Sequence, residues 1–312
     1  MNIAIDTTPL TSAHKNRGVG SYTKNLIEAL QKYENKHSYT LFTRGQKIPD
    51  TVDIVHYPYF DPFFLTLPLN KPKPTVVTVH DLTPIIFPDK FPPGLRGSIK
   101  WQIQKTSLKG AGRIITDSKN SKKDIARIID FDEGKIDVVY LAPGPMFSPG
   151  THKHVGAPYI LYVGDINWNK NIPELRRAFA LVHDRRPRMQ LILVGEAFGN
   201  RLTEKELIEL YRGARLLVLP SHYEGFGFPV LEAMAAGCPV VAADTSSVSE
   251  IAGPAIRVKP DADSIASGME KCLSLSQRAR TDLIDKGFAW VQKFTWQRVA
   301  HETVASYERS FK

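Results

Sequence analysis

Two glutamates flank a glycine-rich segment at a spacing that could bind an anion together with hydroxyl groups. Glu224 and Glu232 are separated by seven residues, and Gly225 and Gly227 follow the first of them. An apolar run ends just before this segment and a helical pattern begins within it. The amides of the first helical turn would therefore favour an anion, and the glycines would let it approach the backbone. The residues alone leave a second interpretation open, a surface acid pair at a helix start, where acids are favourable in any case.

The elements that must position this segment alternate between short apolar runs and amphipathic stretches. Continuous β-branched runs predict parallel strands that are covered on both faces by helices. Strands are expected at residues 2–6, 39–42, 54–57, 75–80, 113–116, 136–140, 159–163, 189–194, 215–219 and 239–242. Helices are expected at residues 19–33, 121–129, 172–184, 204–211, 229–236, 262–273, 277–288 and 296–311.

The alternation is interrupted by a segment that is typical of a linker. Three prolines and two glycines fall within residues 141–150. The predicted domains are therefore an N-terminal domain over 1–145, a linker over 146–157 and a C-terminal domain over 158–295. A last helix, 296–312, could pack back on the N-terminal domain. His152 and His154 lack a third nearby ligand and are expected to be ordinary linker residues.

Composition agrees with a globular protein of two domains. The chain has 312 residues, of which 42% are hydrophobic and 23% charged, which excludes disorder over its whole length. Only two cysteines are present, Cys238 and Cys272, too few for a disulfide framework or a four-ligand zinc site. Neither a signal peptide nor a spanning apolar run is recognised, so a cytoplasmic location is expected, with the inner membrane face as a possible site of action.

The net charge of +9 lies mostly in the N-terminal half, where residues 1–155 contain 21 basic and 14 acidic side chains. Residues 96–127 alone hold nine basic side chains against Asp117 and Asp124. Such a stretch can be a solvated helix face whose apolar side joins the core, or it can contact an anionic membrane through residues 94–127. No nucleic-acid recognition motif accompanies the charge, so nucleic acid is not an expected partner.

The glycine-rich segment resembles family 4 of the retaining glycosyltransferases that have the GT-B fold. Glu224 and Glu232 match the E-x7-E motif of that family, and residues 18–26, 78–88, 116–125 and 162–171 resemble other family segments in the same order. The resemblance covers nearly the whole chain, and His80-Asp81-Leu82 is similar to the mannosyltransferase-like branch. It implies an α/β fold of two Rossmann-like domains whose parallel sheets face each other across a cleft.

The resemblance also implies roles for matching residues of the C-terminal domain. Glu224 would face the transferred sugar, Glu232 would bind the ribose, and Lys170 would neutralise the diphosphate that leaves. The remaining donor-binding residues implied for this domain are Asp165, Asn171, Gly225, Phe226 and Gly227.

In the N-terminal domain, the resemblance implies that Gly18, Val19 and Gly20 approach the donor phosphates. His80 would reach the sugar or the acceptor. The alternative for His80 is a buried histidine at a strand end whose hydrogen bonds are satisfied within the protein.

The implied reaction is transfer of a hexose with retention of configuration, in which the leaving phosphate itself takes the acceptor proton. The two glutamates are therefore not interpreted as a glycosidase pair. The resemblance implies no metal, because GT-B enzymes typically use side chains and helix dipoles where other transferases use Mg²⁺. No cofactor is expected either, because the nucleotide sugar is a substrate; GDP-mannose is the first choice and UDP-glucose the second. The acceptor would be a growing glycan or a lipid-linked glycan. A nucleotide-sugar-binding subunit without turnover and a nucleotide-sugar epimerase are the alternatives.

Two departures from the family affect the predicted donor site. Asp165 stands where the family usually carries an arginine, so Lys170 would act with another cation, such as Arg17 or Arg201, or the diphosphate would be held less tightly. The chain is also short between Asn200 and Arg201, where the family has a further helix and strand. Either that segment is deleted or the sequence omits residues that the polypeptide contains.

Overall fold

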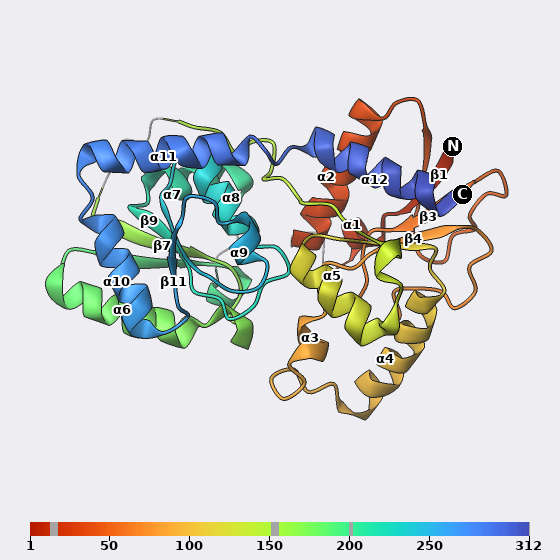
Figure 1. Ribbon diagram of the computed structural model, residues 1–312, viewed down its shortest axis with the longest axis horizontal. Coiled ribbons are helices and arrows are strands. Elements are labelled where there is room, and N and C mark those ends of the chain that lie inside the picture. Colours follow the sequence, from red (N-terminus) through yellow and green to blue (C-terminus); the bar gives the residue numbers. More distant parts are fainter. Residues whose placement is uncertain (13–17, 151–155, 200–201, 312) are drawn as a thin grey trace. The chain divides into compact units, whose positions relative to one another are not determined.

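A computed structural model describes residues 1–12, 18–150, 156–199 and 202–311, which form two compact units. The first unit contains Met1–Leu141 and Thr295–Lys312, and the second contains Ala142–Phe294. The two boundaries in the chain thus fall at 141/142 and 294/295. Each unit is built around a parallel sheet with helices on both faces (Figure 1).

The first unit has a parallel sheet of six strands in the order β2-β1-β3-β4-β5-β6. Its strands are β1 (Asn2–Asp6), β2 (Ser38–Phe42), β3 (Ile54–Tyr57), β4 (Thr75–Thr78), β5 (Arg113–Thr116) and β6 (Ile136–Val138). Its α-helices are α1 (Thr8–Thr11), α2 (Gly18–Tyr33), α3 (Thr83–Ile86), α4 (Gly94–Lys109), α5 (Lys119–Ile125) and α12 (Trp296–Phe311). A π-helical turn, Ala126–Asp130, continues α5, and a short 3-10 helix, Glu133–Lys135, precedes β6.

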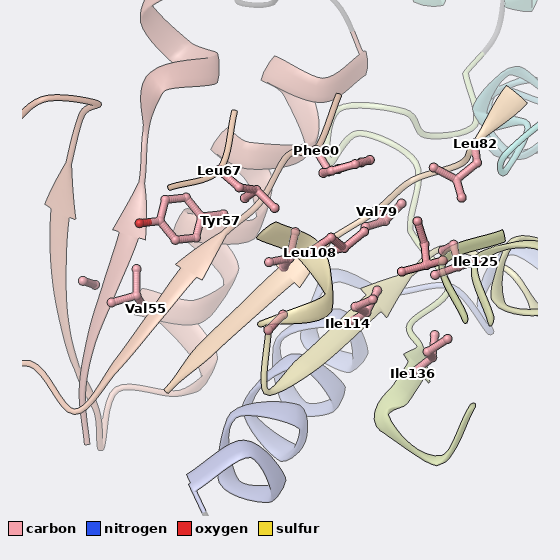
Figure 2. Packing of buried hydrophobic residues seen from close by; sticks show 14 of the residues in the cluster. Val55, Tyr57, Phe60, Leu67, Val79, Leu82, Leu108, Ile114, Ile125 and Ile136 are labelled. Atoms are coloured by element: carbon pink, nitrogen blue, oxygen red, sulfur yellow. The ribbon is translucent and has the colours of Figure 1, made fainter. Parts of the chain in front are cut away.

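The core of the first unit is formed by apolar side chains of the central strands and of the helices that cover them. Ile114, Leu108 and Ile125 are completely buried, and Figure 2 shows them close to Val79 and Ile136. All four residues of β3, β4 and β5 are buried, which explains why their apolar runs are continuous rather than alternating.

The C-terminal helix α12 belongs to the first unit and packs against α2, which it crosses in Figure 1. Its buried Tyr307 shares a hydrogen bond of 2.7 Å between Oη and Nδ1 of His56. Ser306 Oγ donates to a carboxylate oxygen of Asp137 at 2.7 Å, and Arg309 pairs with the other oxygen. These polar contacts fix the helix to β3 and β6.

The second unit has a parallel sheet of five strands in the order β11-β10-β9-β7-β8. Its strands are β7 (Tyr159–Val163), β8 (Gln190–Val194), β9 (Leu216–Leu219), β10 (Val240–Ala243) and β11 (Ile256–Val258). Its α-helices are α6 (Ile172–Arg185), α7 (Glu204–Gly213), α8 (Phe228–Ala235), α9 (Val248–Ile251), α10 (Ala262–Leu273) and α11 (Gln277–Val291). Two 3-10 turns, Trp168–Lys170 and Glu196–Phe198, follow β7 and β8. Helices α6 and α10 pack together on one face, and α7, α8 and α11 cover the other (Figure 1).

The predicted pair of parallel α/β sheets is confirmed, and most predicted elements start or end within a few residues of the observed ones. The elements that the sequence analysis did not assign are α4 and the short segments α1, α3, α9 and β11. The short segments have three or four residues, too few for a periodic pattern to emerge. The predicted strand 75–80 ends at Thr78, so His80 lies just beyond it.

Both sheets place the first strand of the unit next to its third, because the chain reverses its direction of winding there. Such a switch point leaves the loops that follow the two strands side by side at the carboxyl edge of the sheet, where doubly wound folds bind ligands. In the second unit the switch lies between β7 and β9.

Candidate functional site

The switch point of the second unit brings Lys170 and Glu224 together. Lys170 follows β7 and Glu224 follows β9, and these strands are neighbours in the sheet. Lys170 Nζ lies 2.9 Å from Oε1 and 2.8 Å from Oε2 of Glu224. Ser221 Oγ also donates to Oε1 at 2.7 Å. The carboxylate is 8% exposed and the lysine 22%, so the two charges neutralise each other at the rim of the site.

Two asparagines tie the lysine loop to the glutamate loop. Asn169 Nδ2 donates to the carbonyl of Tyr223 at 3.0 Å, and the carbonyl of Asn169 accepts from the amide of His222 at 2.8 Å. Asn171 Nδ2 donates to the carbonyls of Pro220 and Pro260, at 3.0 and 2.8 Å. Asn171 has left-handed backbone angles (φ 56°, ψ 38°) and is buried. These contacts use the amide hydrogens of Asn171 to hold loops in place, and its predicted contact with the donor stays a prediction.

A cluster of hydroxyl side chains after β10 fixes the backbone of the glutamate loop. Ser246 Oγ accepts from the amide of Glu224 at 2.9 Å. Ser247 Oγ lies 2.8 Å from the carbonyl of Glu224 and 3.0 Å from that of Phe226. Thr245 Oγ1 donates to the carbonyl of Ser221 at 2.8 Å. The sequence analysis missed these residues, although three consecutive hydroxyl residues after a predicted strand were the available signal.

The glycine segment leads directly into helix α8. Gly227 caps the helix with a φ of 102°, a region in which a side chain is strained. Gly225, Phe226 and Gly227 are buried, and α8 begins at the next residue. Helix α8 thus begins four residues after Glu224, and the N-terminus of a helix suits a phosphate group.

Glu232 lies in the second turn of α8 and is bound by a tyrosine that the sequence analysis did not single out. Tyr211 Oη donates to Glu232 Oε2 at 2.8 Å. Burial raises the pKa of Glu232 to about 7; the hydrogen bond from Tyr211 lowers it and the charge of Glu204 raises it. Near neutral pH, the predicted ribose-binding carboxyl is therefore close to its titration midpoint.

The carboxylate of Asp165 is turned toward its own backbone. Oδ1 of Asp165 accepts from the amide of Ile166 at 3.2 Å, and its carbonyl accepts from Tyr162 Oη at 2.7 Å. Arg17 and Arg201, the cations suggested as helpers of Lys170, lie outside the described residues. The junction between Asn200 and Arg201 lies outside them too, as do His152 and His154.

The predicted residues of the first unit lie at the carboxyl edge of its sheet. Gly18, Val19 and Gly20 form the first turn of α2, with Gly18 exposed and Gly20 buried. His80 follows β4, and Tyr22 of α2 meets the His80 ring edge-on, with 4.7 Å between the ring centroids. The predicted contacts of these residues with the donor stay predictions.

His80, which is partly exposed, pairs with the buried Asp117, which follows β5. Nδ1 of His80 lies 2.7 Å from Asp117 Oδ2, and Asp117 is almost completely buried. Burial alone would lower the pKa of His80, but the charge and hydrogen bond of Asp117, aided by Asp81 and the carbonyl of Pro58, outweigh it and raise the pKa. The carboxylate thus fixes one ring nitrogen, and the imidazole gains a proton more readily than a free histidine.

The predicted basic segment divides into a buried part and an exposed part. Leu108 of α4 is fully buried, whereas Leu95 and Ile99 at its other end are 81% and 55% exposed. The neighbouring loop adds Phe64, which is 63% exposed. The centroid of its ring lies 5.2 Å from Lys100 Nζ. Gln104 Oε1 fixes that loop to α4 by accepting from the amides of residues 66 and 67. An apolar patch with a basic rim therefore lies at one end of α4.

The described residues contain neither a cluster of metal-ligating side chains nor a helix that could span a membrane. Within residues 1–12, 18–150, 156–199 and 202–311, no group of three or more His, Cys, Asp or Glu side chains is arranged to hold a metal ion. No helix in the same residues is long and apolar enough to cross a bilayer.

Similar solved structures define the class of protein. Sucrose-phosphate synthase from Thermosynechococcus elongatus has a TM-score of 0.74 at 19% identity, covering 99% of this chain and 98% of that one. HepE from Anabaena, in complex with UDP and glucose, has a TM-score of 0.71 at 14% identity, covering 98% and 99%. These similarities establish that the chain has the GT-B fold of two Rossmann-like units.

Sequence comparisons establish the family. Residues 148–290 match the family described as glycosyl transferases group 1, and residues 48–142 match glycosyltransferase family 4. The chain therefore belongs to family 4 of the GT-B glycosyltransferases. O-antigen chain mannosyltransferase B from Escherichia coli is 28% identical over 291 residues, which are 82% of this chain and 75% of that protein. The chain spans less than two thirds of several other mannosyltransferases that it matches.

Proposed function

We propose that this glycosyltransferase moves mannose from GDP-mannose to a growing glycan or lipid-linked acceptor, with retention of configuration and without a metal ion. The pairing of Lys170 with Glu224 carries the proposal. It provides a cation and a carboxylate at one sheet edge, with the carboxylate four residues before α8 begins. Mannosyltransferases among the relatives favour mannose, while the UDP in the Anabaena structure keeps UDP-glucose as the second donor.

Binding of the donor would redistribute the charges of this site. The diphosphate attracts Lys170 away from Glu224, and the amides at the start of α8 add their partial positive charge. The freed carboxylate, still held by Ser221, accepts hydrogen bonds from hydroxyls of the sugar. Negative charge grows on the leaving oxygen as its bond to the anomeric carbon breaks. Lys170 stabilises that charge more in the transition state than in the bound substrate.

The acceptor hydroxyl attacks the anomeric carbon from the face that the diphosphate leaves. Its oxygen forms the new glycosidic bond, and its proton passes to the leaving phosphate oxygen, so no side chain has to become a covalent intermediate. His80, with Nδ1 held by Asp117, is proposed to bind the sugar or the acceptor. The roles suggested for Gly18, Val19 and Gly20 belong to the same proposal.

The test is transfer by the purified protein from GDP-mannose or UDP-glucose to lipid and glycan extracts. Release of nucleoside diphosphate is measured together with the new linkage, whose anomeric configuration is determined by NMR. An α-mannoside that forms from GDP-mannose in the presence of a chelator is the expected product. A product of inverted configuration, or one that requires a metal, would contradict the proposal. Donor binding without release would favour a binding subunit, and a new sugar isomer from donor alone would favour an epimerase.

We also propose that the apolar patch at one end of α4 contacts an anionic membrane, where a lipid-linked acceptor resides. Exposed Leu95, Ile99 and Phe64 could enter the interface while the surrounding lysines face the lipid head groups. Replacing Leu95 and Ile99 by aspartate should weaken binding to phosphatidylglycerol vesicles about tenfold or more. Leu181→Asp, at an exposed leucine of α6, is the matched control. Equal binding by both variants and the wild type would contradict this contact.

A further inference from the structure

A partly buried hydrogen bond between helices α7 and α8 reaches the carboxyl group that is proposed to bind ribose. Tyr211, in the last turns of α7, donates to Glu232 Oε2 at 2.8 Å. The tyrosine side chain has no exposed surface, and the ring of Phe147 packs edge-on against it at 5.8 Å between centroids. The hydroxyl group that donates this hydrogen bond is therefore held in a fixed position by the packing around its ring.

The two oxygens of Glu232 have different surroundings. Oε2 is occupied by Tyr211, whereas Oε1 has no hydrogen-bond partner among the described residues. Glu232 is partly exposed, in contrast to the fully buried Tyr211. A glutamate on a helix normally samples several rotamers, and a rigid donor on one oxygen restricts that sampling. The second oxygen is thereby left available to a ligand in a defined direction.

The hydrogen bond also affects the charge of Glu232. Burial raises the pKa of this carboxyl to about 7, the Tyr211 hydrogen bond lowers it, and the charge of Glu204 raises it. Loss of the tyrosine hydroxyl would leave the carboxyl protonated over more of the neutral range. An ionised carboxylate accepts hydrogen bonds from a diol more strongly than a carboxylic acid does.

We propose that Tyr211 is a positioning residue for the nucleotide: by donating to Oε2 it orients Glu232 so that Oε1 accepts from the ribose hydroxyls. The inference rests on the proposed function, which assigns the ribose to Glu232. Tyr211 itself does not touch the nucleotide in this arrangement, so its effect must pass through the carboxylate.

The experiment measures how strongly the protein prefers a complete ribose. GDP and UDP are titrated against the wild type, Tyr211→Phe and Glu232→Gln, each beside its 2′,3′-dideoxy form. The wild type should bind the complete nucleotide about tenfold more tightly or better, the size expected for hydrogen bonds to a charged group. Tyr211→Phe should reduce this preference to less than about threefold, mainly by weakening the complete nucleotide. Tyr159→Phe is the matched control, since Tyr159 Oη donates to the carbonyl of Leu210.

A second readout separates the hydrogen bond from packing. Incorporation of 3-fluorotyrosine at position 211 keeps the shape of the ring and makes the hydroxyl a stronger donor. The pH at which the ribose preference appears should then fall, whereas Tyr211→Phe should raise it. The phosphate groups titrate in the same way in the complete and the dideoxy nucleotide, so their titration cancels in the ratio of the two affinities.

The possible outcomes separate the positioning role of Tyr211 from the assignment of the ribose to Glu232. If Tyr211→Phe weakens the complete and dideoxy forms equally, or weakens neither, Tyr211 is a packing residue only. An unchanged pH profile with 3-fluorotyrosine would overturn the inference even if Tyr211→Phe did not fold. If Glu232→Gln keeps the full ribose preference, the assignment of Glu232 in the proposed function is wrong as well.

Discussion

Removing the charge of Lys170 should destabilise the ligand-free protein as well as abolish transfer. Lys170 Nζ contacts both carboxylate oxygens of Glu224, and the carboxylate is only 8% exposed. In Lys170→Met, which keeps a side chain of similar length, Ser221 would be the remaining side-chain donor to that carboxylate. A nearly dehydrated charge would then remain without a counter-charge.

The size of the effect follows from the exposure of the two side chains. Loss of one partner from a fully buried ion pair costs about 3–5 kcal/mol. Lys170 is 22% exposed, so part of its own charge is already solvated. We therefore expect Lys170→Met to cost about 2–3 kcal/mol, near or below the lower end of that range. Glu224→Gln should cost about 1 kcal/mol, because an amide can still accept from Ser221 and the lysine can turn toward water.

The double variant provides the decisive comparison. Lys170→Met with Glu224→Gln leaves no uncompensated charge, so it should be less destabilised than the sum of the single variants by about 1–2 kcal/mol. Urea unfolding of the four proteins measures this coupling free energy. Arg257→Met is the matched control, because Arg257 forms an ion pair with Asp244 in the same unit but both side chains are at least 40% exposed. That variant should lose less than about 1 kcal/mol.

The same variants test the role in transfer. Lys170→Met should reduce turnover about 10²- to 10³-fold, the usual cost of removing one group that stabilises charge in the transition state. Arg257→Met should retain its activity. Additive stabilities within about 0.5 kcal/mol would refute the neutralisation of Glu224 by Lys170, and wild-type turnover in Lys170→Met would refute the proposed donor site.

Three further predictions follow from buried groups and from the backbone. The pKa of Glu232 in the folded state is raised to about 7 from 4.5, so the free energy of unfolding should fall as the pH rises between those values. Glu232→Gln should flatten that fall, as measured by denaturation across this pH range. Asp117→Asn should lower the pKa of His80, measured by NMR. In the wild type the protonated histidine should stabilise the fold at low pH and lose this effect as the pH rises through its raised pKa, and the variant should lack this pH-dependent contribution. Gly227→Ala should cost about 1–2 kcal/mol in thermal unfolding, because φ at this position is 102°.

The sequence predicted which residues meet at the candidate donor site to the extent that the site depends on the ends of apolar runs. Lys170 and Glu224 each follow a strand that periodicity identified, and the motif around Glu224 indicated a ligand. The two strands are neighbours because of the sheet order, β9-β7. No local pattern in the sequence indicates this order. The direct pairing of the two side chains was therefore not predicted; each had been assigned a separate partner on the donor.

Residues that act at a distance along the chain were missed for the same reason. Tyr211 and Glu232 are 21 positions apart, and Ser246 supports Glu224 from 22 positions away. A buried tyrosine in an amphipathic helix has the same pattern as any core residue, so only the contact reveals its hydroxyl partner. Elements of three or four residues, such as β11, are likewise defined by their pairing with β10 rather than by their own composition.

Asn171 shows why a family motif alone does not assign a function to each of its members. Its position next to Lys170 favoured a donor contact, yet its side-chain amide bridges the carbonyls of Pro220 and Pro260 from a left-handed backbone. An aspartate there could accept the left-handed conformation but would have no hydrogens to donate to those carbonyls. Asn171 therefore supports the loop that carries Lys170, whether or not it also touches the donor.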